Sequence, residues 1–341
     1  MAAKKQAIFL DAVVLESCNL KCSYCRDGLI YKKEEVEQTV ARVKKAIEIG
    51  AIADYDIFKI SGYGEVTLLD NLGEISDLAK DKRLLVISNG TRLPQGSLEK
   101  ILAHPDPALC ISLDGHTEEM NSYRELSQSQ IDAVVKTLKD VQGKGIPIEI
   151  NSVITGKNIG QFPQFLEFLL TQLPRVMVFP FPVRPFPFMH SEDYSVSPAQ
   201  LSAFEKKVIG GYEKYGQVLP PRAYLMREVE FIKHGSRSFV CTVPSFVIGI
   251  NGNMDVLGCP CGSPEKLGNL NNTPLVDISG KLLSSKKGRW KECKNCFNHY
   301  EVISMYVDGK ITGEEISRVP SISKPAILEH LRQIKGEYKH G

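Results

Sequence analysis

The chain has 341 residues, enough for one domain of about 200 to 250 residues and a smaller one. Its formal charge of +2 predicts no nucleic-acid or anionic-membrane partner, and 43% hydrophobic with 24% charged residues is typical of soluble globular proteins. No uncharged run approaches the roughly 18 residues that span a bilayer, and the N-terminus lacks the features of a signal peptide. We therefore expect a cytoplasmic protein whose nine cysteines are metal ligands more often than disulfides.

Strand and helix patterns alternate six times along the first 220 residues or so. The strands are apolar and rich in β-branched residues, and the helices repeat apolar residues at spacings of three and four. Predicted strands cover 7–15, 55–61, 83–88, 108–115, 146–154 and 175–181. Predicted helices cover 34–50, 72–80, 95–103, 131–141, 162–173 and 201–212. This order indicates an α/β fold with a parallel sheet, and six units suit a partial (β/α)6 TIM-like barrel better than a closed barrel of eight.

The pattern changes near residue 220 to short strands, glycines and turns. We expect three parts: the partial barrel over 1–220, a small cysteine-rich α+β domain over 221–310, and a helical tail over 311–341. The last predicted helix carries Ile327, Leu331 and Ile334 on one face, which we expect to dock on the body of the protein.

The loop after the first predicted strand contains Cys18, Cys22 and Cys25. Ligands bind at the carboxyl ends of parallel strands, so this loop lies where a site is expected. Four thiolates hold a structural zinc or a 4Fe–4S cluster. Three thiolates leave one iron of a cluster open to a small chelating ligand. The alternative is a zinc site completed by a distant residue.

The C-x3-C-x2-C spacing, with Tyr24 before the third cysteine and the first strand just upstream, resembles the radical SAM superfamily. In that family the open iron binds the amino and carboxylate groups of S-adenosylmethionine. Its reductive cleavage yields a 5′-deoxyadenosyl radical that takes a hydrogen atom from the substrate. The resemblance covers about the first two-thirds of the chain and implies a 4Fe–4S cluster, S-adenosylmethionine and a reductant such as flavodoxin or ferredoxin.

The resemblance also assigns cofactor contacts to loops that follow later strands. The stretch GYGE resembles the family's glycine-glycine-glutamate motif for the methionine amino group, although Tyr63 separates the glycines and Val66 replaces the usual proline. An arginine fork suits the methionine carboxylate, and the LDG stretch lies near the ribose or carboxylate. The implied cofactor-binding residues are Tyr24, Gly62, Gly64, Glu65, Asn89, Ser112, Asp114, Arg124 and Asn151.

Structural roles compete with several of these assignments. Glu65 could be a carboxylate in the first turn of a helix. The Asp114–Gly115 pair could be a simple turn, and Arg124 a surface cation. A further cysteine, Cys110, lies inside a predicted strand, where a buried small hydrophobic residue is expected rather than a reactive thiol.

A second cysteine set follows residue 220. Four thiolates suit a closed site that holds zinc or a cluster, and the layout resembles the twitch domain, the shorter form of the SPASM extension, which implies an auxiliary 4Fe–4S cluster. One further thiol, Cys261, could replace Cys259 as a ligand, be a structural spare, or return a hydrogen atom to the substrate radical. The four expected ligands are Cys241, Cys259, Cys293 and Cys296.

A hydrogen-donating Cys261 predicts an epimerase, whereas an auxiliary cluster that accepts an electron predicts a dehydrogenase. The cysteine motif begins at residue 18, which leaves no room in this sequence for a leader-binding domain before it. We therefore expect oxidation or epimerisation of a small carbohydrate-like or aminocyclitol-like molecule.

Two other functions stay open: maturation of a ribosomal peptide or protein by epimerisation or cross-linking, and a non-catalytic zinc-binding protein. The loop over 179–195 follows the sixth strand on the expected substrate side, or else only covers the open edge of the barrel. Its polar candidates for substrate contact are Arg184, His190, Glu192 and Asp193.

Overall fold

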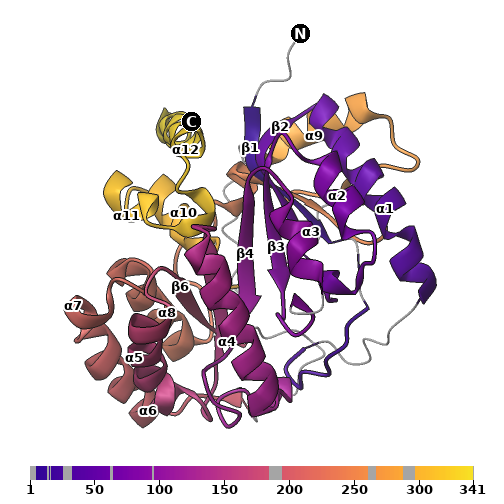
Figure 1. The fold of residues 1–341 in the computed structure, drawn as a ribbon. Helices are drawn as coiled ribbons and strands as arrows, with labels where there is room; N and C mark the ends of the chain where they lie inside the picture. The colour runs from indigo at the N-terminus through magenta and orange to yellow at the C-terminus, as the bar shows by residue number, and fades with distance from the viewer. Residues whose placement is uncertain are drawn as a thin grey trace.

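The computed structural model of the chain describes most of its residues. The described ranges are 5–13, 15, 17–25, 33–61, 64–93, 96–183, 194–259, 266–286 and 296–340. Figure 1 shows a curved sheet whose helices are packed along its faces. No helix in these ranges is long and apolar enough to cross a membrane.

Six parallel strands form the main part of the sheet. They lie side by side in the order of the sequence, and each pairs with the next. The expected partial barrel of six strand–helix units is therefore confirmed. The strands are β1 (Lys5–Val13), β2 (Asp54–Ser61), β3 (Arg83–Ser88), β4 (Pro107–Ser112), β5 (Ile148–Ile154) and β6 (Met177–Pro182).

Helices follow each of these strands, and their apolar stripes are buried as the periodicity predicts. In the longest of them, Gln128–Gly143, the apolar residues at these spacings are at most 8% exposed: Ile131, Val134, Val135, Leu138 and Val141. The helix predicted over 201–212 is interrupted, because a π-helical turn over Glu205–Ile209 follows its first segment. The helices are α1 (Lys33–Ile47), α2 (Leu72–Leu78), α3 (Ser97–Leu102), α4 (Gln128–Gly143), α5 (Phe162–Gln172), α6 (Pro198–Phe204) and α7 (Tyr212–Tyr215).

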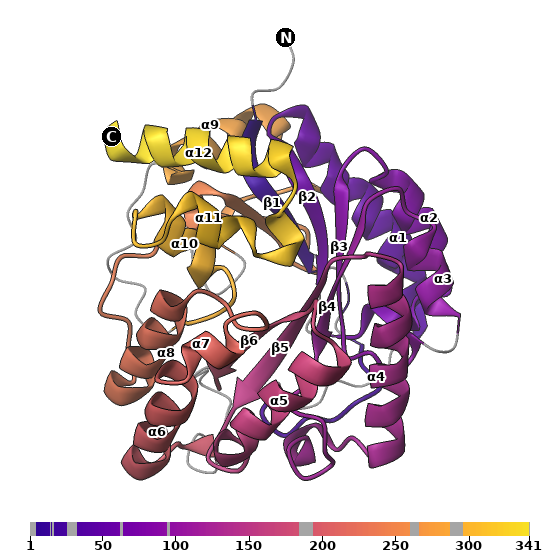
Figure 2. The same cartoon turned by 60° about the vertical axis from the view of Figure 1, so that its left-hand side comes forward.

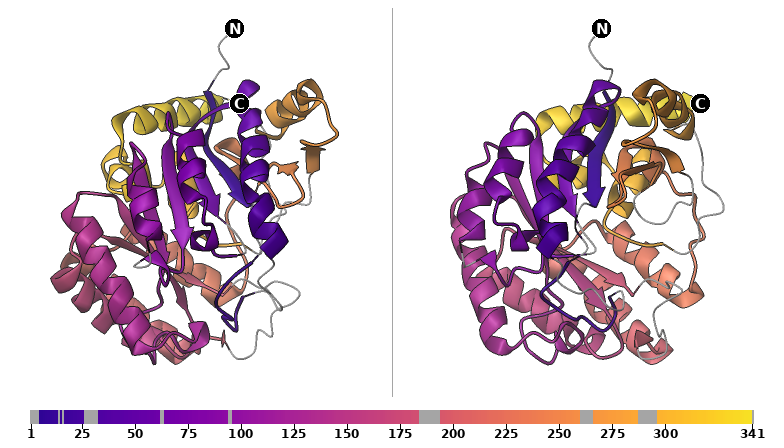
Figure 3. Two further views of the ribbon diagram at one scale, coloured as in Figure 1. Left: turned by 45° about the vertical axis from the view of Figure 1, so that its right-hand side comes forward. Right: turned by 90° about the vertical axis from the view of Figure 1, so that its right-hand side faces the viewer.

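The C-terminal strands extend this same sheet rather than forming a separate one. β7 (Val247–Ile250) pairs in parallel with β1, and β8 (Asp255–Leu257) and β9 (Lys266–Asn269) continue the sheet as antiparallel strands. In Figure 3 the orange segment that contains them lies beside the indigo first strand. The proposed domain boundary at residue 220 thus falls within one continuous sheet, and the three-part division stays a prediction.

The remaining helices complete the C-terminal part. Figure 2 shows α1 to α4 along one face of the sheet and α10 and α11 against the other. The predicted apolar face of the last helix is buried, as expected. These helices are α8 (Arg222–His234), α9 (Leu275–Lys286), α10 (Glu301–Val307), α11 (Gly313–Ser317) and α12 (Pro325–His340).

A buried polar cluster joins the C-terminal segment to the inner wall of the barrel. Asp11 on β1 and Lys59 on β2 form an ion pair of 2.6 Å. The hydroxyl of Tyr300 donates to the same Asp11 oxygen at 2.7 Å and accepts from Lys59 Nζ at 2.9 Å. The Tyr300 ring also packs edge-on against Phe9 at 5.1 Å. The segment before α10 therefore closes the inside of the barrel next to its first strand.

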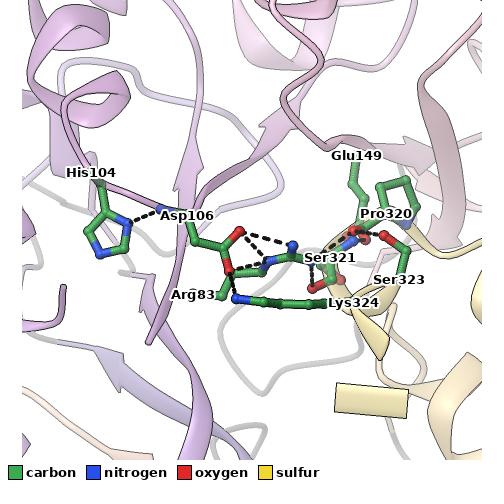
Figure 4. Close-up of polar contacts among 8 residues, drawn as sticks. All are labelled: Arg83, His104, Asp106, Glu149, Pro320, Ser321, Ser323 and Lys324. Atoms are coloured by element: carbon green, nitrogen blue, oxygen red, sulfur yellow. Dashed lines mark hydrogen bonds and ion pairs between the residues drawn. The ribbon is translucent and has the colours of Figure 1, made fainter. Parts of the chain in front are cut away.

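A second cluster fastens the C-terminal tail to the start of β3 and β5 (Figure 4). Arg83 donates to both oxygens of Asp106 at 3.0–3.2 Å and to the carbonyls of Pro320 and Ser321 at 3.3 and 2.9 Å. Glu149 accepts from the Ser321 backbone N–H at 2.8 Å. Because these partners are largely buried, each bond fixes the tail at the amino end of the barrel, away from the cysteine loop.

We expect Arg83→Ala to lower the free energy of unfolding by about 3 kcal/mol, because it removes a donor from the carbonyls of Pro320 and Ser321 and leaves the Asp106 carboxylate with Lys324 as its remaining charged partner. Arg332→Ala is the matched control, since Arg332 pairs with Glu329 on an exposed helix surface and should cost less than about 0.5 kcal/mol. Urea unfolding measures both. Equal effects of the two substitutions would contradict the role given to Arg83.

Candidate active site

The three cysteines of the first loop follow β1 at the carboxyl edge of the sheet, where the sequence predicts them. Cys18, Cys22 and Cys25 are half-buried. Burial raises the pKa of Cys22 to about 11, with Arg124 opposing the shift and the other two thiols adding to it. The three thiols are therefore neighbours, and cluster binding requires that they lose their protons.

The arrangement of the three thiols in this loop can be compared with the ligand arrangements of a zinc ion and of a 4Fe–4S cluster. Among the described residues, no three Cys, His, Asp or Glu side chains are grouped as ligands of one metal ion. Each thiolate of a 4Fe–4S cluster binds a different iron, so the thiolates need not converge on one point. The donor set of three neighbouring thiols thus fits a cluster better than a single zinc ion.

Asp114 is the centre of a buried network beside the loop. Its carboxylate accepts from the Tyr24 hydroxyl at 2.6 Å and from the Val153 backbone N–H at 2.8 Å, and it pairs with Arg124 at 3.0 Å. Arg124 is 6% exposed, so it is not a surface cation. Burial raises the pKa of Tyr24, which keeps its phenol protonated as a donor.

The turn that carries Asp114 is held by a residue that the sequence did not single out. The Asn121 side-chain oxygen accepts from the Asp114 backbone N–H at 3.0 Å. Its amide donates to the carbonyls of Gly115 and Thr117 at 2.9 and 2.8 Å. Asn121 is fully buried. An asparagine that binds its own loop backbone has no signature in one sequence that marks it as part of a site.

The GYGE loop is bonded to the cysteine loop. Gly64 and Glu65 donate their backbone N–H groups to the carbonyls of Leu15 and Ser17 at 3.2 and 2.8 Å. Glu65 also caps the short 3-10 helix Val66–Leu68. The structural role at a helix start, which the sequence offered as an alternative to cofactor binding, is therefore present.

The two oxygens of the Glu65 carboxylate accept different numbers of hydrogen bonds. One oxygen, Oε1, accepts from Thr67 N, Thr67 Oγ1 and Ser88 Oγ at 3.0, 2.5 and 2.7 Å. The other, Oε2, accepts only from the Asn89 backbone N–H, at 2.6 Å. A carboxylate oxygen has two lone pairs, which leaves Oε2 able to accept from an amino group as well.

Asn89 faces the cysteine loop. Its side-chain amide donates to Asn19 Oδ1 at 2.9 Å and lies 4.0 Å from the Cys18 sulfur, and its oxygen accepts from Thr91. The structure therefore brings Asn89 to the cluster side of the site. Asn19 and Thr91, which bond to each other at 2.9 Å, complete this polar group and were missed from the sequence.

Ser112, the last residue of β4, is the register partner of Asn151 in the middle of β5. The side-chain oxygen of Asn151 is buried and has no hydrogen-bond partner, and the same is true of Arg124 Nε. Buried polar groups are rarely left unpaired. One free acceptor and one free donor at this edge fit a polar cofactor with both hydroxyl and carboxylate groups.

Three tyrosines enclose the cysteine loop. The rings of Tyr24, Tyr123 and Tyr194 contact one another edge-on with centroids 4.9–6.4 Å apart. The Tyr194 hydroxyl donates to the carbonyl of Ser23 at 2.7 Å, and the Ser23 backbone N–H donates to the carbonyl of Tyr123 at 2.8 Å. Both contacts clamp the backbone between Cys22 and Cys25.

Three expected ligands of the second cysteine set are buried: Cys241, Cys259 and Cys296. Arg237 donates to the Cys296 carbonyl through Nε and Nη2 at 3.0 and 2.6 Å, and Glu301 pairs with Arg237 at 3.0 Å. A buried ion pair thus fixes the backbone of one expected ligand. Cys110 is buried in β4, in keeping with its structural role.

Several predicted residues lie outside the described residues. Among the site residues these are Gly62, Cys261 and Cys293, and in the loop after β6 they are Arg184, His190, Glu192 and Asp193. Their assignments stay predictions.

The fold and the cysteine loop define a barrel enzyme that carries its reactive group at the carboxyl edge of its strands. The sequence pattern of the radical SAM superfamily matches residues 13–169, and the chain contains a radical SAM domain. The cofactors of this family are a 4Fe–4S cluster and S-adenosylmethionine, as the cysteine loop implied.

Named relatives match about half of the chain. Neomycin C epimerase of Streptomyces fradiae is 32% identical over 167 residues, which cover 47% of this chain and 50% of that protein. Fe-coproporphyrin III synthase of Methanosarcina barkeri is 26% identical over 162 residues, or 47% of this chain and 40% of the other. The matches thus span half or less of the length of these curated relatives.

Solved structures share the fold over more of the chain. The structure of native anSMEcpe with bound AdoMet has a TM-score of 0.59 at 16% identity, and the match covers 98% of this chain and 97% of that one. Streptococcus suis SuiB bound to the precursor peptide SuiA gives a TM-score of 0.56 at 15% identity, with 81% and 65% covered. At these identities the likeness concerns the fold.

We expect Tyr194→Phe to loosen the cysteine loop, because it removes the phenol that binds Ser23, a bond worth about 0.5–1.5 kcal/mol. Tyr123→Phe is the matched control, since Tyr123 contacts Ser23 through its backbone carbonyl. Hydrogen–deuterium exchange of the segment 17–25 should speed up several-fold in the first variant only. Equal exchange in both variants would show that the phenol does not hold the loop.

Proposed function

We propose that the chain is a radical SAM enzyme that abstracts a hydrogen atom from a C–H bond of a small carbohydrate-like or aminocyclitol-like substrate, followed by oxidation or epimerisation. The observation that carries this proposal is the Asp114 network, which joins the cysteine loop to β4 and β5 and leaves Arg124 Nε and Asn151 Oδ1 free. In this proposal the protein consists of a partial barrel over 1–220, an auxiliary domain over 221–310 and a helical tail over 311–341.

In this proposal each described residue has one task. Cys18, Cys22 and Cys25 bind the cluster, which together with S-adenosylmethionine supplies a 5′-deoxyadenosyl radical once a reductant such as flavodoxin or ferredoxin donates an electron. Arg124 binds the methionine carboxylate through its free Nε, and Asn151 accepts from a ribose hydroxyl. Asp114 keeps Arg124 oriented, and Tyr24 ties it to the cysteine loop.

The other assigned residues surround these. Glu65 accepts the methionine amino group at Oε2, with Gly62 and Gly64 allowing close approach of the backbone. Asn89 orients the loop at Cys18. Ser112 lies beside Asn151 at the ribose.

The second cysteine set serves electron transfer. We assign Cys241, Cys259, Cys293 and Cys296 to an auxiliary 4Fe–4S cluster, with Arg237 holding the backbone of Cys296. In dehydrogenation the auxiliary cluster held by these cysteines would supply the acceptor for one electron of the substrate radical, and solvent would take one proton. In epimerisation the Cys261 thiol would give a hydrogen atom to the substrate radical, and the thiyl radical that remains would take up one electron from the flavodoxin- or ferredoxin-type reductant and one proton from solvent.

The choice of substrate class is supported by a relative whose name gives neomycin C as the molecule that it epimerises. Neomycin C epimerase is 32% identical to this chain over 167 residues, or 47% of its length. Structural likeness to a peptide-bound SuiB concerns the fold only. A peptide substrate is therefore an alternative outcome of the experiments below.

After anaerobic reconstitution we expect about eight irons per chain, four for each cluster, and formation of 5′-deoxyadenosine under dithionite. The triple variant Cys18→Ala, Cys22→Ala, Cys25→Ala should lose 5′-deoxyadenosine and about four irons. Cys241→Ala with Cys296→Ala should lose about four irons but keep uncoupled cofactor cleavage. Two zinc ions and no iron in the wild type would contradict the proposal.

In deuterated solvent we expect one deuterium at one carbon of the product if Cys261 donates the hydrogen atom, because a thiol exchanges with solvent. Cys261→Ala should abolish this incorporation. Cys110→Ala is the control, since it removes the other cysteine that no cluster uses. Mass spectrometry of the product measures both variants. Incorporation that survives Cys261→Ala would rule out this donor, and an oxidised product without deuterium would identify a dehydrogenase.

A further inference from the structure

Six carboxylates of the described residues are almost completely buried: Asp11, Glu65, Asp114, Glu149, Glu228 and Glu301. Five of them accept hydrogen bonds from lysine, arginine, hydroxyl or backbone donors. The exception is Glu228 on α8, which is 0% exposed and has no partner at either oxygen. This carboxyl group is therefore the one buried acid of the described residues whose partner is missing from the chain itself.

The position of Glu228 follows from its helix face. Tyr224 lies four residues before it and Phe231 three residues after it, so all three share one face of α8. Both rings pack on Phe297, with centroids 5.1 and 5.6 Å away. Phe297 directly follows Cys296. The Glu228 side chain thus extends from α8 toward the segment of the auxiliary cysteines.

The same face of α8 also contacts the end of the barrel. The Tyr224 ring packs on Phe179 of β6 at 5.5 Å, and its hydroxyl donates to the carbonyl of Pro180 at 3.2 Å. Phe179 is the register partner of Asn151, so its side chain projects from the same face of the sheet. Glu228 therefore lies near the middle of β6, on the side of the sheet where Asn151 leaves an acceptor free.

An isolated buried carboxyl group is costly to a protein. Burial alone raises the pKa of Glu228, and no charged group contributes to the shift. In the free chain an uncharged side chain of the same size would stabilise the fold at least as well as Glu228 does. Such a residue is best explained by a binding partner that supplies the missing donors.

We propose that Glu228 is a substrate-binding residue that takes a primary ammonium group of an amine-bearing substrate. This inference rests on the proposed function and narrows its substrate class from carbohydrate-like molecules to amino sugars and aminocyclitols. An ammonium group supplies three N–H donors for the two open oxygens of Glu228.

Burial also determines how this site distinguishes an ammonium group from an uncharged group of the ligand. Because Glu228 has no exposed surface in the free chain, the side chains that cover it must move when the ligand binds. The ammonium–carboxylate pair is then formed out of water, where an uncharged ligand group could not replace it. A hydroxyl in place of the amine would leave the carboxyl group short of donors, and binding should fall accordingly.

The test uses the reconstituted enzyme with S-adenosylmethionine and neomycin C as the amine-bearing probe. We expect Glu228→Gln to weaken binding of neomycin C at least tenfold by anaerobic calorimetry. Glu230→Gln is the matched control, because Glu230 lies two residues further along α8 on its exposed side. Fully N-acetylated neomycin C, which keeps the rings but carries no ammonium group, should bind weakly and equally to the wild type and to Glu228→Gln.

Two further measurements separate this role from a structural one. The melting temperature of Glu228→Gln and Glu228→Met should equal or exceed that of the wild type, whereas loss of a stabilising residue would lower it. Uncoupled formation of 5′-deoxyadenosine by the wild type and by the control Glu230→Gln is measured alongside, which reports on the proposed function independently.

The outcomes are distinct. A wild type that forms no 5′-deoxyadenosine would overturn the proposed function. A wild type that cleaves S-adenosylmethionine but does not bind neomycin C saturably would overturn the inference alone. The same holds if Glu228→Gln binds neomycin C as tightly as the wild type or if either variant melts at a lower temperature.

Discussion

The bond between Tyr24 and Asp114 joins the two halves of the candidate site. It ties the cysteine loop, which follows the first strand, to the ends of the fourth and fifth strands. Arg124 adds its charge to the same carboxylate. Since Tyr24 lies between Cys22 and Cys25, the position of the thiols depends on a carboxylate some 90 residues further along the chain. A cluster and its cofactor would thus be held in one frame.

The C-terminal segment also contacts the strands that support the cysteine loop, from inside the barrel. Tyr300 binds the Asp11–Lys59 pair on the first two strands, and Arg237 holds the carbonyl of Cys296 four residues earlier. The two cysteine sets are therefore connected through the core by short, buried paths. The separation of the described cysteines of the two sets is therefore fixed by packing and not by a flexible linker.

Local patterns predicted much of this. Periodicity gave the six strands and their helices, and the spacing around Cys18 located the loop at the carboxyl edge. Contacts between distant residues were not predictable, because neither Asn121 nor Tyr194 belongs to a motif and each acts through backbone groups. The pairing of β7 with β1 was missed for the same reason: a short apolar strand carries no information about its neighbour. Glu228 resembled any polar helix residue until its burial was known.

The place of β7 in the sheet has a consequence for biosynthesis. Phe9 has its neighbour on one side in β2 and on the other in Val247. Until the ribosome has made β7, the first strand is an unprotected edge that can pair with any other chain. The nascent protein therefore carries its cysteine loop next to an open edge for most of its synthesis. Shielding of that edge, by a chaperone or by rapid completion of the chain, becomes a condition for making this protein at all.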